Sequence, residues 1–239
     1  MSGSTPLSEL ALQVSACRQC PRLVAWREQV ARERRAAFAD QVYWGRPLPG
    51  FGDPAARVLV LGLAPAAHGA NRTGRLFTGD RSGDWLFAAL WRTGFANQPG
   101  SHAPQDGLRL QDCWITAAVR CAPPANRPTP AERDRCLPWS VRELDLLEQL
   151  RVVVCLGAFA WDAALRLLAA AGLPVARPRP RFSHGARAAV GELTVLGSYH
   201  PSQQNTFTGR LTEAMTDDVL LEARRRAGLA PAHPAGGAR

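Results

Sequence analysis

Four short apolar segments, spaced along the chain, are the feature that most limits how this sequence can fold. Each is rich in Val, Ile and Leu and lacks the alternation of apolar and polar residues typical of half-exposed strands. They are RVLVLG (57–62), CWITAAV (113–119), RVVVCLG (151–157) and LTVLGSY (193–199). Segments with a helical pattern lie between them. Buried strands that alternate with helices predict an α/β fold with a largely parallel sheet.

Capping signals predict three helices among these strands. Ser82 is placed to act as the N-cap of the first, and Thr129 begins a capping box that opens the second. One or two further helices are expected in residues 7–35. The three predicted helices cover residues 82–94, 129–150 and 158–172.

Length and composition favour one domain. The chain has 239 residues, 46% of them hydrophobic, and it shows no internal repeat. We predict a single domain over residues 1–228, followed by a low-complexity tail, 229–239, that is expected to be disordered. No apolar run approaches the roughly 20 residues of a membrane span, and the N-terminus does not resemble a secretory signal. We therefore expect a soluble, cytoplasmic protein.

The charge balance indicates a polyanionic partner. The formal net charge is +9, and all 29 basic residues are Arg. A GC-rich coding bias would explain the use of Arg in place of Lys, but it would not explain the positive surplus, which favours nucleic acid. Without Lys, no lysine amine can form a Schiff base with a sugar aldehyde. A lyase step would have to use the α-amino group.

Four of the six cysteines lie in polar, turn-rich segments and predict a metal site. Disulfides are disfavoured in an intracellular protein, and a thioredoxin-like context for the CRQC motif is missing. Spacing alone does not separate a four-thiolate zinc site from an iron–sulfur cluster. Cys113 and Cys155 lie inside apolar strands and are predicted to be buried core thiols. The four candidate ligands are Cys17, Cys20, Cys121 and Cys136.

A glycine-rich segment, GLAPAAHGANRTGRLFTGD (62–80), follows the first apolar strand directly. Such a turn indicates a ligand close to the backbone. It lacks the Gly-Lys-Ser/Thr ending of a P-loop, so a nucleoside triphosphate is not the predicted ligand.

With these motifs in place, the sequence resembles the uracil-DNA glycosylase superfamily, specifically its bacterial and archaeal iron–sulfur members, often called family 5 or type B. The resemblance covers roughly residues 10–222 in consistent order. Besides segment 62–80, it rests on CRQCP (17–21), YWGRPLPGFGDP (43–54), ITAAVRCAPPANRPTP (115–130) and SYHPSQQNTFTGRLT (198–212).

The resemblance implies a three-layer α/β/α fold around a four-stranded parallel sheet. It implies a structural [4Fe–4S] cluster held by the four candidate cysteines. It also implies a monomeric, nucleoid-associated DNA glycosylase that removes uracil, and other deaminated bases such as hypoxanthine, to begin base excision repair. A non-catalytic iron–sulfur protein that binds damaged or single-stranded DNA is the alternative, and a zinc protein of unrelated function is a third.

The resemblance also assigns roles to individual residues. His200 follows the last predicted strand at its carboxyl end, where ligands bind in open α/β sheets. It is expected to donate a hydrogen bond to a carbonyl oxygen of the leaving base. Phe77 is expected to stack on that base, above a pocket floor formed by Gly62, Ala64 and Pro65. The alternatives are a turn-capping His and an ordinary core Phe.

Two polar residues are candidates for positioning the attacking water: Asn71 and Asp80, with His68 behind them in the base pocket. Asp80 could equally be a helix N-cap. Leu63 and Ala64 stand where better-known relatives carry a polar side chain, and Ala117 stands where some carry Asn. A pocket with few fixed hydrogen-bond partners discriminates poorly between bases, which predicts a broad substrate range.

The segment after His200 is expected to engage DNA. Phe207 or Leu211 would wedge into the vacated base stack. The Arg-rich loop 177–187 could also follow phosphates, although a solvated surface role is the alternative for each Arg. The expected DNA contacts are Ser202, Asn205, Arg210, Arg72 and Arg75.

Overall fold

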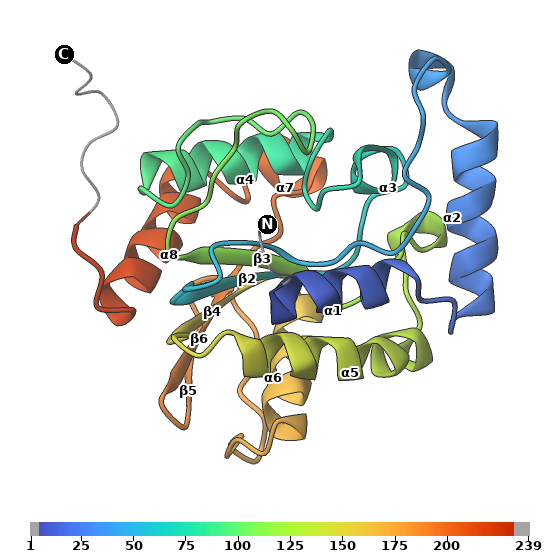
Figure 1. Cartoon of the computed structure of the whole chain (residues 1–239). Helices are drawn as coiled ribbons and strands as arrows, with labels where there is room; N and C mark the ends of the chain where they lie inside the picture. The colour runs from blue at the N-terminus through green and yellow to red at the C-terminus, as the bar shows by residue number, and fades with distance from the viewer. Residues whose placement is uncertain (1–4, 232–239) are drawn as a thin grey trace.

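A six-stranded sheet forms the centre of the computed structural model, which describes residues 5–231 (Figure 1). The strand order is β1-β3-β2-β4-β6-β5. The four inner strands are parallel, whereas β1 and β5 are antiparallel to their neighbours. The strands are β1 (Phe51–Gly52), β2 (Val58–Gly62), β3 (Cys113–Ala117), β4 (Val152–Leu156), β5 (Arg187–Val190) and β6 (Leu193–Ser198).

The four inner strands confirm the four predicted apolar segments and the predicted parallel sheet. The two edge strands were not predicted from the sequence. β1 is only two residues long, and β5 alternates exposed and buried residues, so neither contains an apolar run.

Helices cover both faces of the sheet, which confirms the three-layer α/β/α class (Figure 1). One face is covered by α4 and α8, and the other by α5 and α6, with α1 beside α5. The α-helices are α1 (Pro6–Ser15), α2 (Pro21–Glu33), α3 (Ala70–Thr73), α4 (Arg81–Arg92), α5 (Pro130–Leu146), α6 (Ala158–Ala170), α7 (Gln203–Phe207) and α8 (Glu213–Arg226), with short 3₁₀ turns at Ala36–Phe38 and Pro124–Asn126.

Successive residues of β2 show why the inner strands are apolar throughout. Val58 and Val60 pack into the core under α4 and α8, while Leu59 and Leu61 pack into the core above α6. All four are buried. Each such side chain contributes about 1.5–3 kcal/mol when removed from water. A strand buried on both faces therefore needs an apolar residue at every position.

Helix capping follows the sequence in one case and departs from it in another. The capping box that Thr129 forms with Glu132 is confirmed. The prediction of Ser82 as the N-cap of α4 is wrong: the helix begins one residue earlier, and the carboxylate of Asp80 accepts a hydrogen bond from the backbone N–H of Gly83 at 3.0 Å.

The chain after α8 folds back onto that helix. Leu229 packs against the core, and Arg224 donates hydrogen bonds to the carbonyl oxygen of Ala230. The rest of the predicted tail, residues 232–239, lies outside the described residues. The helices of residues 5–231 include none that is long and apolar enough to cross a membrane.

Candidate active site and four-cysteine site

The carboxyl ends of β2, β4 and β6 meet at one edge of the sheet, and His200 follows β6 there. Next to it, Gly157 ends β4 with a φ of +94°, a conformation that side chains rarely adopt. A Cβ on Gly157 would lie 3.3 Å from the Cβ of His200. The histidine therefore packs directly over the end of the neighbouring strand.

The imidazole of His200 is neutral at physiological pH. Burial lowers its pKa to about 4, because the apolar surroundings disfavour the charged ring. Its backbone is fixed by two hydrogen bonds to its carbonyl oxygen, from the backbone N–H of Ser202 at 2.8 Å and from Nδ2 of Asn205 at 2.9 Å. A neutral imidazole on a fixed backbone can donate one N–H to a ligand.

Phe77 is held next to His200 by an unusual backbone. Its φ is +54°, which is uncommon for a residue with a side chain and indicates local strain. A Cβ on Gly62 would lie 2.6 Å from Cζ of Phe77, and one on Gly83 would lie 1.7 Å from its carbonyl oxygen. Glycine at these two positions therefore lets the aromatic ring lie directly on the end of β2.

The predicted pocket floor is apolar. Gly62 pairs in register with Ala117 at the ends of β2 and β3, and both are buried. Pro65 is buried as well. Ala64 packs against the apolar cluster around the cysteines, so the base loop and the four-cysteine site are neighbours.

Asp80 caps α4 and lies deep in the glycine-rich segment. A Cβ on Gly69 would lie 2.2 Å from Oδ2 of Asp80, so the carboxylate fits only because position 69 lacks a side chain. Burial raises the pKa of this carboxyl group. The capping role is present, and the raised pKa leaves a carboxylate that is a better proton acceptor than an exposed one.

Asn71 and His68 bond to residues outside the glycine-rich segment. Asn71 is completely buried, and its Nδ2 donates to the carbonyl oxygen of Arg27, on α2, at 3.2 Å. Its Oδ1 has no hydrogen-bond partner among the described residues. Nδ1 of His68 lies 3.0 Å from the hydroxyl of Tyr43, and burial lowers the pKa of this imidazole.

Arg72 and Arg75 stabilise the loop from within. The guanidinium of Arg72 donates to the carbonyl oxygens of His68 and Gly79. Arg75 is buried and forms an ion pair of 2.6 Å with Asp106. These partners do not fit the predicted phosphate contacts.

The two residues predicted to enter the base stack, Phe207 and Leu211, differ in exposure. Leu211 is buried, so it cannot enter a base stack. Phe207 is 68% exposed, and the guanidinium of Arg81 lies 5.2 Å from its ring centroid. Arg210 is exposed and lies over the ring of Tyr199 at 4.7 Å. The sequence did not predict that Arg81 lies beside this ring, because Arg81 and Phe207 are far apart in the chain.

The four predicted metal ligands surround one small cavity. None forms a disulfide; Cys20, Cys121 and Cys136 are buried, and Cys17 is half-buried. Burial raises the pKa of the Cys121 thiol to about 12. Without a bound cation this thiol would stay protonated, whereas metal binding requires a thiolate. Cys113 and Cys155, the two predicted core thiols, are confirmed as buried in the sheet.

Arginines supply positive charge to this cavity. Nη1 of Arg27 donates to Sγ of Cys121 at 2.8 Å, although the side chain is only 2% exposed. Arg120 lines the same cavity but is already paired with the buried Glu143 at 2.6 Å, and the Nε atoms of both arginines have no hydrogen-bond partner among the described residues. Buried cations with unused donors fit an anionic group held by thiolates. No sequence motif marks Arg27, which lies in the middle of α2.

The thiols themselves are not arranged around a single ion. Within the described part of the chain, no group of three or more His, Cys, Asp or Glu side chains is placed to hold one metal ion. A zinc ion would need four sulfur atoms at about 2.3 Å from one point.

The fold and the strand-end site define the class of this protein. The family model of the uracil DNA glycosylase superfamily matches residues 49–224, and the chain belongs to this superfamily. Within it, the chain belongs to the type-5 uracil-DNA glycosylases, which confirms the resemblance to family 5.

Two type-5 relatives carry this assignment. The chain is 57% identical over 229 residues to the Type-5 uracil-DNA glycosylase of Mycobacterium tuberculosis, a match that covers 95% of this chain and 84% of that protein. It is 54% identical over 218 residues to the Type-5 uracil-DNA glycosylase of Thermus thermophilus, covering 90% and 96%. A Type-4 uracil-DNA glycosylase of Archaeoglobus fulgidus is 30% identical over 156 residues, covering 65% and 70%.

Proposed function

We propose that this protein hydrolyses the N-glycosidic bond between uracil and deoxyribose in DNA and leaves an abasic site. The observation that carries the proposal is the neutral His200, after the carboxyl end of β6, beside Phe77, which lies on the carboxyl end of β2. The names and high identity of the type-5 relatives support the same reaction. The chain has no Lys, so strand cleavage through a lysine Schiff base does not accompany it.

His200 would stabilise the departing base. When the glycosidic bond breaks, uracil leaves as an anion, and the negative charge develops on a carbonyl oxygen. A positioned N–H donor at that oxygen is typically worth about 2.7–4 kcal/mol in the transition state. Because its pKa is low, the ring of His200 is neutral and supports a role in which its one N–H donates a hydrogen bond without transferring a proton to the base.

Phe77 would hold the flipped base. An aromatic face accepts any base, and such stacking is worth about 1–3 kcal/mol. Gly62 supports this role, because the ring can lie on the strand end only where no Cβ is present. The enzyme must extract the base from the DNA helix before the bond can be cut, and stacking on Phe77 would offset part of the free energy lost in unstacking and unpairing the base.

Asp80 would position the attacking water. Its carboxylate already accepts the N–H of Gly83, and the raised pKa makes it a better proton acceptor than an exposed Asp. Asn71 is the second candidate: its Nδ2 is bonded to the carbonyl oxygen of Arg27, while its Oδ1 has no partner among the described residues and could accept a hydrogen bond from the water.

A broad substrate range follows from the apolar floor. Ala64, Pro65 and Ala117 offer no side-chain hydrogen bond to distinguish one base from another. We propose activity on hypoxanthine as well as uracil, since a pocket without fixed polar partners rejects few bases.

Phe207 would enter the gap left by the flipped base. It is exposed on α7, immediately after the His200 loop, and Arg81 lies beside its ring. Arg210 and Ser202 would contact phosphates on the same side, while Asn205 acts through the carbonyl oxygen of His200.

The four cysteines would hold a [4Fe–4S] cluster that joins the N-terminal helices to the strand-end loops. The buried Arg27, which donates to Cys121 and has an unused Nε donor, supports an anionic group at this place. A brown protein with iron and sulfide supports the cluster, and a colourless protein with one zinc contradicts it.

We propose that the chain acts as one domain over residues 1–228 and as a monomer, at the nucleoid where its DNA lies. Both apolar cores share the same sheet, which supports a single domain.

A glycosylase assay tests the function. Duplexes that carry uracil, hypoxanthine or xanthine are treated with the protein and then with alkali, and strand breaks are counted. His200→Ala should slow uracil release about 100- to 1,000-fold. His102→Ala, at an exposed loop position, is the matched control. No product from any base, with DNA binding intact, would favour the non-catalytic alternative.

A further inference from the structure

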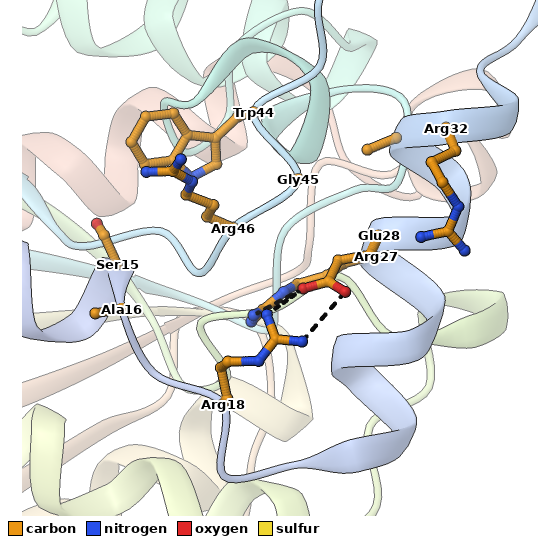
Figure 2. A pocket seen from close by; sticks show the side chains of 10 residues that line it. Ser15, Ala16, Arg18, Arg27, Glu28, Arg32, Trp44, Gly45 and Arg46 are labelled. Carbon is orange, nitrogen blue, oxygen red and sulfur yellow. Dashed lines mark hydrogen bonds and ion pairs between the residues drawn. The ribbon is translucent and has the colours of Figure 1, made fainter.

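An open groove of about 460 Å³ lies between α2, the end of α1 and residues 44–46 (Figure 2). None of the residues given a role in base excision lines it. Its charged and aromatic lining residues are Arg18, Arg27, Glu28, Arg32, Trp44 and Arg46. Four positive side chains and one negative side chain leave this groove with a net charge of +3.

The arginines differ in how far they are already engaged. Arg18 forms an ion pair with Glu28 across the groove, and Arg27 is buried against Cys121. Arg32 and Arg46 are exposed, and neither makes an ion pair with another residue of 5–231. Two unpaired guanidinium groups therefore remain for a ligand.

Trp44 holds Arg46 at the rim of the groove. The guanidinium carbon of Arg46 lies 5.6 Å from the centroid of the Trp44 ring. Figure 2 shows the two side chains together at the groove. The ring itself is oriented by a hydrogen bond from Nε1 to the carbonyl oxygen of Pro47 at 3.1 Å. A cation stacked on a fixed aromatic ring loses less side-chain freedom when it binds an anion.

The groove is continuous with the base loop. The backbone N–H groups of Trp44 and Gly45 donate to the carbonyl oxygens of Arg72 and Asn71, at 2.9 and 3.0 Å. The Trp44 ring also lies against Gly74, where a Cβ would be 3.3 Å away.

The groove lies close to the loop that carries Phe77. Gly74 precedes Phe77 by three residues, which span at most about 11 Å. Successive phosphates of one DNA strand advance by about 3.4 Å along the helix. Because a few nucleotides span such a distance, we expect the backbone beside a base held on Phe77 to pass the loop that the Trp44 ring contacts.

We propose that this groove binds the phosphodiester backbone of the DNA strand beside the flipped base, through Arg32 and Arg46. The inference rests on the proposed function for the identity of the ligand. It adds a strand-positioning site that lies outside the base pocket and the α7 segment, on the side of the four-cysteine site.

The test compares charge-matched variants of the full, cluster-loaded chain. Arg32→Gln with Arg46→Gln removes both free cations. Arg225→Gln with Arg226→Gln removes two exposed cations from α8, at the opposite end of the molecule in Figure 1. Binding of a fluorescent single-stranded oligonucleotide without uracil is measured by anisotropy at several salt concentrations. Iron content and thermal midpoint show that each variant is folded and loaded.

The groove variant should bind the oligonucleotide about tenfold more weakly, and its log–log salt slope should fall by about two. Arg46→Lys should restore part of the binding, since a lysine also pairs with phosphate. KM for a long uracil substrate should rise while kcat stays constant, and cleavage of a trinucleotide too short to reach the groove should not change. The α8 variant should bind as the unmodified chain does.

Binding and salt slope equal to those of the unmodified chain would overturn the inference, even if uracil is cleaved. Displacement of the oligonucleotide by inorganic phosphate, beyond the effect of chloride at equal ionic strength, would also overturn it, since that result indicates a small-anion site. Weakened binding in the groove variant of a chain that cleaves no base would instead uphold the groove and contradict the proposed function.

Discussion

The rings of Phe77 and His200 lie with their centroids 6.3 Å apart and their planes inclined by 32°. The two residues come from loops after β2 and β6, strands that are separated by β4 in the sheet. Gly62 lies under one ring and Gly157 under the other residue. The pair therefore bounds the space at the strand ends in which a base would be held.

Replacement of Phe77 should weaken base capture. Phe77→Ala removes the stacking face, and we expect kcat/KM for uracil release to fall about 5- to 150-fold, the equivalent of about 1–3 kcal/mol. Phe77→Leu keeps an apolar side chain without the aromatic face and serves as the control. Equal activity of both variants and the unmodified enzyme would remove the stacking role.

A methyl group on Gly62 should displace the Phe77 ring. Because the new Cβ would lie 2.6 Å from Cζ of Phe77, we expect Gly62→Ala to lower kcat/KM at least tenfold. The double variant with Phe77→Leu should lose less stability than the two single changes added together, since the shorter side chain relieves the clash. Strictly additive losses in thermal unfolding would show that the two residues do not interact.

The pH profile should report a neutral His200. With its pKa near 4, the imidazole does not titrate at the ordinary value of about 6.5, so the single-turnover rate should be level from pH 6 to 8. The rate should fall toward pH 4 as His200 takes up a proton. An inflection near pH 6.5 that disappears in His200→Ala would contradict this.

Stability should follow the same group. Between about pH 4 and 6.5 the folded protein binds fewer protons at His200 than the unfolded chain does, so stability rises with pH in this window. The contribution is complete above pH 6.5 and is lost as the pH falls through 4. Denaturation curves should show that the free energy of unfolding of the unmodified protein rises between about pH 4 and 6.5, and that His200→Ala lacks this part of the rise.

Two substitutions at Asp80 separate capping from catalysis. Asn is as good an N-cap as Asp, so Asp80→Asn should keep the thermal midpoint but slow the reaction about tenfold or more. Asp80→Ala should show the same loss of rate and a further loss of about 1 kcal/mol in stability. If Asp80→Asn is fully active, capping alone explains the residue.

Replacement of Arg27 should speed the loss of iron from the proposed iron–sulfur cluster. Arg27→Met keeps the length of the side chain but removes the donor to Cys121 and its positive charge. We expect iron to be released to a chelator several-fold faster, followed by visible absorbance. Arg151→Met, at an exposed position, is the control. An unchanged rate of iron release would show that the hydrogen bond does not stabilise the group.

Most of the fold could be predicted from local sequence patterns. The four inner strands and the capping box at Thr129 were predictable, because an unbroken apolar run and a capping motif have their effect within a few residues. The edge strands were not, since β1 and β5 pair only because a longer strand offers them hydrogen bonds.

The candidate site divides in the same way. Local patterns already place His200 and Phe77 after buried strands and four cysteines outside the sheet. The packing of distant segments is needed to see that Arg75 is buried in an ion pair with Asp106, whereas the side chain of Phe207 is exposed. Burial and ion pairing depend on residues far apart in the chain, and no local spacing records them.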